Sequence, residues 1–214
     1  MLPVGAFSYS QGLEWAVESG AITNRAQAER WIFDVLRWSV GRFEAPLLIA
    51  ARRAWSAGDD ARVVELDRLM AATRETRELL AETMQLGYSL RRWCVDAGAV
   101  DDGWLGRVNA LEAPTWPIVY AAIAAAWQIE ERSMLSAYLW TWLENQVSAA
   151  LKAVPLGQTA GQRILLASAQ LLEQATDDAF ALSTRPREHW STQCPGLAIA
   201  SASHETQYSR LFRS

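Results

Sequence analysis

The stretch RETRELLAETMQLGYSLRRWCVDA, residues 74–97, carries the longest helical pattern in this chain of 214 residues. One side of the pattern is mainly apolar and consists of Leu79, Leu80, Thr83, Leu86, Tyr88, Leu90 and Trp93. The other side is mostly charged and consists of Arg74, Glu75, Arg77, Glu78 and Glu82. Because these steps of three and four residues match one face of an α-helix, the stretch predicts a long amphipathic helix with Gly87 inside it.

Helical patterns continue on both sides of this stretch. We expect helices over about 10–19, from an N-cap at Asn24, from Pro46 to Gly58, after an Asp59-Asp60 cap, and over about 117–129, 132–153 and 156–175. Alternating runs of β-branched residues, which are typical of strands, are missing from the sequence. Residues 98–117 are rich in glycine, proline and aspartate and predict the main irregular connection.

The whole pattern predicts an all-α protein, a single-domain helical bundle of about eight to ten helices with an extended C-terminal arm. We expect the bundle over residues 1–182 and the arm over 183–214, within the same domain. The arm holds Pro186, Pro195 and Gly196 among many serine and threonine residues. A short helix is expected to resume in it at His204.

Composition narrows the class of partner and the compartment. The net charge is −4 and the basic residues are scattered, so nucleic acid is not an expected partner. The longest apolar run, 118–127, falls well short of the roughly 20 residues that span a membrane. The first residues show no secretory leader, and Cys94 and Cys194 suggest free thiols. We therefore expect a cytoplasmic protein.

Three near-matches to chemical motifs each lack a required residue. Residues 8–12 have Ser8 where the first glycine of a hydrolase elbow belongs, so a serine that caps a helix is the better interpretation. Residues 157–162 lack the lysine of a phosphate-binding loop, and Tyr208 replaces the second histidine of a zinc motif that begins at His204. The sequence therefore predicts no catalytic residue, no cofactor and no metal site within one chain.

Several separated motifs resemble the urease accessory protein UreF family. They are LPVGAFSYSQGLE at 2–14, RETREL at 74–79, ETMQLG at 82–87, ENQV at 144–147 with AALK at 149–152 and VPLGQ at 154–158, and AIASASHETQYSRLFRS at 198–214. Ordered agreement of separated motifs across nearly the whole chain is more specific than any single match.

The resemblance implies an all-α homodimer that is not itself an enzyme. It implies partnership with a second accessory protein, UreD (also called UreH), and with the GTPase UreG, in a complex that docks on apo-urease. In that family role the protein is a chaperone of metallocentre assembly, in which nickel insertion is coupled to GTP turnover. Three alternatives stay open: restraint of the GTPase, strict activation by an arginine finger, and a nickel-binding or nickel-conducting subunit.

The arm supplies the first set of candidate site residues, expected to bind UreD/UreH and UreG. This set is His204, Glu205, Tyr208, Arg210, Leu211, Phe212 and Arg213. Aromatic, aliphatic and arginine side chains concentrate binding energy in interfaces, and the family resemblance implicates Arg210 in assembly of the complex. We expect the arm to be poorly ordered until a partner binds. The alternative is that it folds back on its own bundle.

The second set is expected to face the GTPase or to line an internal water or metal path. It consists of Phe7, Ser8, Tyr9, Ser10, Glu14, Glu144, Lys152, Gln158 and Gln162. Lys152 is the only lysine and lies in an apolar helical region, where a buried polar group needs a partner. A plain ion pair within the chain is the competing interpretation. The spacing of Trp31, Trp38, Trp127 and Trp140 follows helical stripes and predicts core or interface positions.

Overall fold

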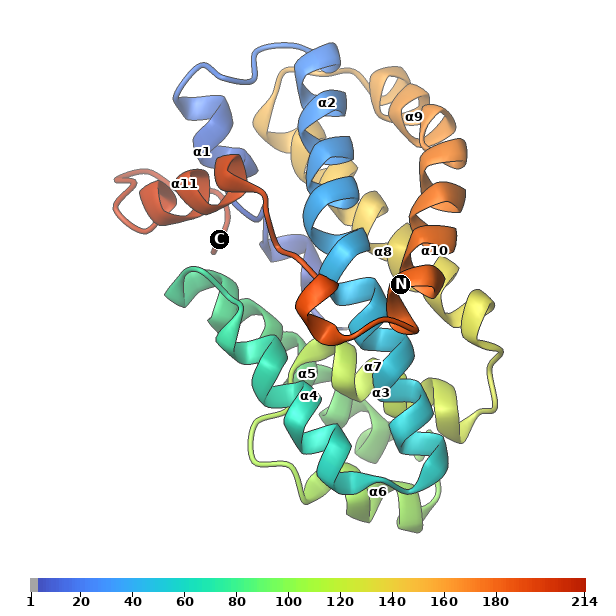
Figure 1. Ribbon diagram of the computed structural model, residues 1–214. Coiled ribbons are helices and arrows are strands. Elements are labelled where there is room, and N and C mark those ends of the chain that lie inside the picture. Colours follow the sequence, from blue (N-terminus) through green and yellow to red (C-terminus); the bar gives the residue numbers. More distant parts are fainter. Residues whose placement is uncertain (1–3) are drawn as a thin grey trace.

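The computed structural model describes residues 4–214, so Leu2 and Pro3 of the N-terminal motif lie outside the described residues (Figure 1). Every regular element within 4–214 is helical, which confirms the predicted all-α fold. None of the helices in this range has both the length and the apolar composition that a membrane span requires.

The elements follow one another along the chain with short connections. They are η1 (Ala6–Ser8), α1 (Leu13–Glu18), α2 (Arg25–Val35), η2 (Leu36–Glu44), α3 (Ala45–Ala57), α4 (Asp60–Ala72), α5 (Arg77–Ala97), α6 (Asp102–Asn109), α7 (Trp116–Ala126), α8 (Glu131–Ala153), α9 (Gln158–Ala167), α10 (Ala169–Ser183), η3 (Arg187–His189) and α11 (Pro195–His204). The decisive stretch of the sequence forms α5.

Local side-chain bonds begin the helices where the sequence predicts. The Asn24 side chain accepts a hydrogen bond from the N–H of Gln27 at 3.1 Å, and Asp59 accepts one from Arg62 at 3.0 Å. Each bond satisfies an amide that has no partner within its own helix. The predicted N-caps of α2 and α4 are therefore confirmed.

The helix expected from Pro46 to Gly58 is confirmed as α3, with Pro46 in its first turn and Gly58 as its C-cap residue, but no turn separates it from the helix before it. α2, the π-helical segment η2 and α3 follow one another without a turn between them, as the blue and cyan ribbon in Figure 1 shows. Pro46 has no N–H to give to the carbonyl of Arg42, one helical turn earlier. That carbonyl instead accepts the N–H of Ser191 at 3.2 Å. The proline therefore leaves a free acceptor that holds the segment leading to α11.

Three further predictions of local structure are wrong. Residues 98–117 contain α6, because Asp101 caps it by accepting the N–H of Trp104 at 3.0 Å. The stretch 156–175 is divided between α9 and α10 at Ser168, whose hydroxyl donates to the carbonyl of Leu165 at 2.7 Å. Within the expected arm, a helix ends at His204 instead of beginning there, since Pro195 occupies the first turn of α11.

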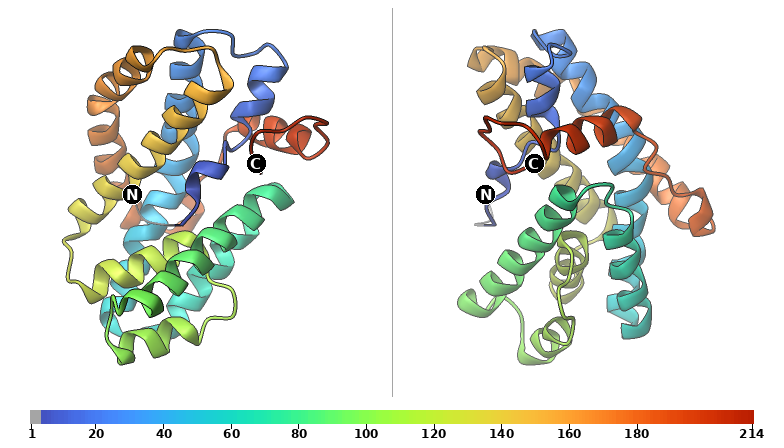
Figure 2. Two further views of the ribbon diagram at one scale, coloured as in Figure 1. Left: turned by 180° about the vertical axis from the view of Figure 1, so that it is seen from behind. Right: turned by 90° about the vertical axis from the view of Figure 1, so that its left-hand side faces the viewer.

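α3 is the central helix of the bundle and packs against α4, α7, α8 and α10. The main apolar core surrounds it, and a smaller core joins α1, α2, α8 and α9 through side chains such as Leu13, Ile32 and Leu143. Figures 1 and 2 show α4 to α7 gathered at one end of the molecule, with α1 and α11 side by side near the carboxyl-terminal end of the chain. α5 therefore reaches from the first group toward the tail.

Gly87 marks the closest approach between α5 and the segment that leads into α7. A Cβ atom at this position would lie 2.0 Å from the carbonyl oxygen of Pro114 and 2.9 Å from the carbonyl carbon of Thr115. The segment is also fixed from the other side, because Asp67 accepts both the N–H and the hydroxyl of Thr115 at 2.8 Å. Only glycine fits here without a shift of the backbone.

We predict that Gly87→Ala lowers the free energy of unfolding by about 3 kcal/mol, since overpacking against an anchored backbone forces a displacement. Chemical denaturation followed by circular dichroism measures this loss. Gly106→Ala in α6 is the matched control, because nothing lies within 4 Å of a Cβ atom there. The control is expected to be neutral or slightly stabilising, as alanine favours a helix. Equal stability of the two variants would contradict the packing account.

Candidate functional site

The last residues of the chain, 205–214, fold back onto the bundle. α11 packs against α1 (Figure 2), and Gly12, at φ +77°, allows the approach because a Cβ atom there would lie 3.0 Å from the side chain of Ala200. Beyond α11, the N–H of Arg213 donates to the carbonyl of Ser8 at 2.9 Å. The structure thus has the folded-back tail that the sequence analysis left as the alternative.

Glu14 in α1 holds the tail by its main chain. Its carboxylate accepts the N–H of Leu211 at 2.6 Å and the N–H of Phe212 at 2.9 Å. The Glu14 side chain is buried, and so is the Phe212 ring that follows it. A buried carboxylate that accepts two amides makes charge-assisted hydrogen bonds, the stronger class in proteins. Glu14 is therefore covered by the tail and does not face solvent.

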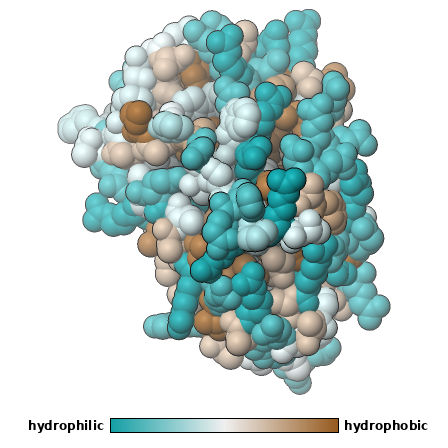
Figure 3. All heavy atoms as spheres, in the orientation of Figure 1, coloured by the Kyte–Doolittle hydropathy of each residue, from teal (hydrophilic) through white to brown (hydrophobic). Residues whose placement is uncertain are grey.

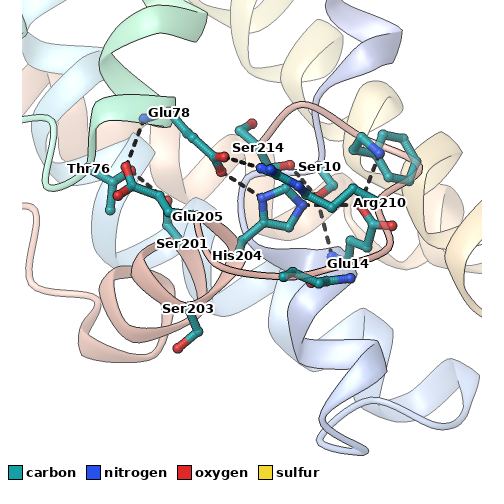
Figure 4. Close-up of polar contacts among 12 residues, drawn as sticks. Ser10, Glu14, Thr76, Glu78, Ser201, Ser203, His204, Glu205, Arg210 and Ser214 are labelled. Carbon is teal, nitrogen blue, oxygen red and sulfur yellow. Dashed lines mark hydrogen bonds and ion pairs between the residues drawn. The ribbon is translucent and has the colours of Figure 1, made fainter.

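His204, at the end of α11, lies between two carboxylates and has no exposed surface (Figure 4). Its Nε2 atom is 3.1 Å from Glu14, and its Nδ1 atom is 2.6 Å from Glu78 of α5. Both ring nitrogens therefore lie within hydrogen-bonding distance of a carboxyl oxygen. Arg210 also donates to Glu78 at 2.6 Å. The cluster thus joins two carboxyl groups, an imidazole and a guanidinium from α1, α5, α11 and the tail.

The end of the tail is tied to Ser10 and Glu82. The Ser10 hydroxyl donates to the carbonyl of Ser214 at 2.5 Å and accepts the N–H of Glu14 at 3.2 Å. The Ser214 hydroxyl donates to Glu82 at 2.7 Å, and Gln11 donates to the other carboxyl oxygen at 2.8 Å. Burial raises the pKa of Glu82 to about 7. We call Ser10, Glu14, Glu78 and Glu82 the tail clamp.

A small polar pocket of about 50 Å³ lies beside Glu82, between η2, α5 and α8. Glu44 in its wall pairs with Arg74 at 3.0 Å and accepts the hydroxyl of Tyr138 at 2.8 Å. Burial, and then the Glu44 carboxylate, raise the pKa of Tyr138 well above its ordinary value. Within residues 4–214, the buried Nε atom of Arg74 has no hydrogen-bond partner. The pocket has room for a few water molecules at such groups.

Exposed side chains beside the clamp form what we call the tail surface. Its members are Phe7, Lys152, Tyr208, Arg210, Leu211 and Arg213. Tyr208 is fully exposed, Leu211 is 74% exposed and Phe7 is 55% exposed. The Lys152 ammonium lies 5.7 Å from the ring centre of Phe7 and 5.8 Å from that of Phe212, a cation–π arrangement that joins α8 to both ends of the chain.

The structure divides the first predicted set of site residues. Tyr208, Arg210, Leu211 and Arg213 are exposed, Glu205 is half-buried, and His204 and Phe212 are buried beneath the tail. His204 and Phe212 therefore hold the tail and cannot contact a partner while it stays in this position.

The second predicted set is also dispersed. Ser10, Glu14 and Tyr9 are buried, Ser8 is half-buried, and Phe7, Glu144, Lys152, Gln158 and Gln162 are exposed. None of these exposed residues lines the polar pocket. Lys152 makes no ion pair within residues 4–214, so the competing prediction for it is wrong.

The sequence analysis missed the buried polar groups of the bundle. Those that line the polar pocket are Glu44, Arg74, Glu82 and Tyr138. Glu82 was assigned to the charged side of α5 and is buried, with 4% of its surface exposed. Its spacing of three residues from Leu79 and four from Leu86 places it on the apolar face and would have identified it. In residues 4–214, no cluster of three or more histidine, cysteine, aspartate or glutamate side chains has the arrangement of a metal site.

Comparison with known proteins identifies the relatives of this chain. The UreF sequence profile matches residues 22–169. The urease accessory protein UreF of Azoarcus sp. (strain BH72) is 55% identical, over 100% of this chain and 91% of that protein. The protein of the same name from Dechloromonas aromatica (strain RCB) is 50% identical, over 100% and 92%. That from Methylobacillus flagellatus is 47% identical, over 100% and 93%.

The helical fold, the clamped tail and these matches define a urease accessory protein. Within that class, the chain belongs to the UreF family.

We predict that Glu14→Gln loosens the tail, because one oxygen that accepts hydrogen bonds becomes an amide donor. Loss of one charge-assisted hydrogen bond in a buried site costs about 2 kcal/mol, or more than tenfold in local opening. Amide hydrogen exchange at Leu211 and Phe212 should rise accordingly. Glu18→Gln, at an exposed position of the same helix, is the control and should leave the exchange unchanged. Unaltered protection in both variants would mean that Glu14 does not hold the tail.

We also predict that Glu82 makes the protein less stable as pH rises. Its pKa of about 7 in the folded state exceeds the ordinary value of 4.5, so the folded state holds the proton more tightly between these values. The stabilising contribution is therefore present near pH 4 and lost as pH passes 7, a change of about 3 kcal/mol. Glu82→Gln stays neutral and should have a flatter profile.

Chemical denaturation of the native chain and Glu82→Gln at pH 5 and pH 8 measures the difference. Groups other than Glu82 titrate alike in both proteins, so the comparison isolates this carboxyl. Parallel profiles would show that Glu82 does not take up a proton on folding.

Proposed function

We propose that this chain is a non-catalytic scaffold for urease maturation in the cytoplasm. In this proposal it joins a UreD/UreH accessory protein and the UreG GTPase in a complex that docks on apo-urease for nickel insertion. Membership of the UreF family supports the assignment to urease maturation. The tail surface supports the role of a scaffold, since no group of convergent titratable side chains resembles a catalytic centre there.

The observation that carries the proposal is an exposed apolar segment on a fixed main chain. Tyr208 and Leu211 are largely solvent-exposed, although the amide of Leu211 is held by Glu14 at 2.6 Å. A preorganised segment loses little conformational entropy when it binds, which favours affinity. The tail surface is therefore the site that we assign to the UreD/UreH partner, with UreG adjoining it.

Arg210 contributes to this site in two ways. It pairs with Glu78 at 2.6 Å and so neutralises a carboxylate of the clamp, and 39% of its side chain stays exposed. Its removal is expected to weaken assembly both by loss of a contact and by release of the tail.

A nickel-conducting role is a second candidate, favoured by the polar pocket. Glu44 and Glu82 line this pocket together with the amide side chains of Gln11 and Asn145. Oxygen donors of this kind accept hydrated divalent cations. A Glu82→Gln protein that assembles normally but yields urease without nickel would support this candidate over a purely structural role.

We further propose that the chain forms a homodimer through the exposed side of α10. Trp38 and Trp140 flank this helix and are 45% and 43% exposed. Arg132 and Asp177 beside them already pair with each other at 2.7 Å. An isologous interface would bury this same patch on both copies. The remaining surface in the view of Figure 3 is mostly hydrophilic, with apolar side chains in small patches.

We predict that Tyr208→Ala with Leu211→Ala abolishes assembly without unfolding the chain, since both side chains lie outside the core. Arg210→Ala, and a version ending at Ser203, should also fail to assemble. Each protein is purified together with the UreD/UreH and UreG partners and examined by size-exclusion chromatography with light scattering, which also reports whether the isolated chain is a dimer.

Leu166→Ala is the matched control for this experiment, because Leu166 is equally apolar and 78% exposed but lies on α9. It should assemble normally. If all variants assemble like the native chain, recognition lies outside the tail surface. If the native chain itself fails to assemble with both partners, the scaffold proposal is wrong.

A further inference from the structure

A second pocket, which we call the apolar pocket, lies between α5, α7 and the first turns of α8. Leu90, Ala124 and Met134 are its most buried members, and Trp93 and Trp127 stand at its more exposed side. None of the residues that line it belongs to the tail clamp, the tail surface or the polar pocket. The proposed scaffold role therefore leaves this pocket without a use.

The size of the apolar pocket limits its ligand to one ring system. Its volume is about 130 Å³. A dry protein cavity of about 150 Å³ lined by aliphatic and aromatic side chains is known to take up benzene. A ligand of two or more separate rings would not fit.

The chemistry of the wall limits the charge of the ligand. No aspartate, glutamate, lysine, arginine or histidine lines the pocket. Its hydroxyl groups come from Tyr120 and Ser133, and burial raises the pKa of Tyr120, so this hydroxyl is neutral at physiological pH. Because a charge loses its hydration in such a site without gaining a partner, charged ligands are rejected.

The two indole rings of the pocket favour an aromatic ligand. The ring centres of Trp93 and Trp127 are 6.2 Å apart and the rings meet edge to face at 79°. The indole N–H of Trp127 already donates to the carbonyl of Ala99 at 2.6 Å, which fixes this ring. Fixed aromatic faces and edges offer the offset and edge-to-face contacts that aromatic rings prefer.

We propose that the apolar pocket binds a free, neutral small molecule with a single aromatic ring system, of phenol to indole size. The hydroxyls of Tyr120 and Ser133 supply at most a hydrogen bond or two to orient it. The bound ring lies close to the polar pocket, because Tyr120 contacts Tyr138 at 5.3 Å between ring centres and Tyr138 donates to Glu44. Binding of a ligand in the apolar pocket is therefore expected to alter the hydrogen bonds of the buried Glu44 side chain.

Titration of the full chain with indole by isothermal calorimetry tests the proposal, with indole-3-carboxylate as the charged analogue. Indole should bind one site per chain with saturation and raise the melting temperature. The carboxylate should bind at least about tenfold more weakly, because its charge has no partner in the pocket. Absence of saturable binding of indole, or equal binding of the two probes, would overturn the proposal.

Ala137→Phe locates the binding to this pocket. Ala137 is an exposed member of the wall, so a phenyl ring there occupies the ligand's space without disturbing the core. Indole binding should weaken at least about tenfold, equivalent to loss of about 1.4 kcal/mol. Ala61→Phe, at an exposed position of α4, is the matched control and should bind indole like the native chain. Retained binding in Ala137→Phe would also refute the proposal, provided that its circular dichroism is native.

Discussion

The buried carboxylate of Glu14 is the group on which the arrangement of both ends of the chain depends. It accepts the amides of Leu211 and Phe212 and faces the ring of His204, so one side chain of α1 fixes α11 and the tail together. A buried anion is unfavourable unless it is fully hydrogen-bonded, and the tail supplies those hydrogen bonds. The tail therefore stabilises the buried Glu14 carboxylate, and the carboxylate in turn holds the tail against the bundle.

The clamp also connects the tail to the interior of the bundle. Glu78 and Glu82 are one turn apart on α5, and they hold Arg210 and Ser214 respectively. Glu82 in turn lines the polar pocket that contains the Glu44 and Arg74 pair. Tyr208 and Leu211 therefore belong to a segment that is linked to the buried polar groups through only one or two hydrogen bonds. The tail and the buried polar groups of the bundle thus share one hydrogen-bond network.

The sequence predicts most of the helices, but it predicts fewer of the side chains that hold the tail or line the polar pocket. Periodicity and capping residues predict α2, α4, α5, α7 and α8, because these signals act within a few residues of each other. The continuity from η2 into α3 was not predicted, since the donor that compensates for Pro46, the N–H of Ser191, is remote in sequence. Glu82 was missed because a charge was taken to mean exposure. Exposure of Tyr208 and burial of Phe212 follow from contacts with α1 that no local pattern contains.

The bonds of Glu14 also affect the order in which the protein is completed during synthesis. Glu14 and Leu211 are separated by 197 positions, so the ribosome makes the carboxylate long before the amides that satisfy it. Until those residues emerge, α1 carries a solvated charge that opposes its burial against the rest of the chain. The amino-terminal segment is accordingly among the last parts to reach its final position. A nascent chain would then lack the folded-back tail until residues 205–214 have left the ribosome.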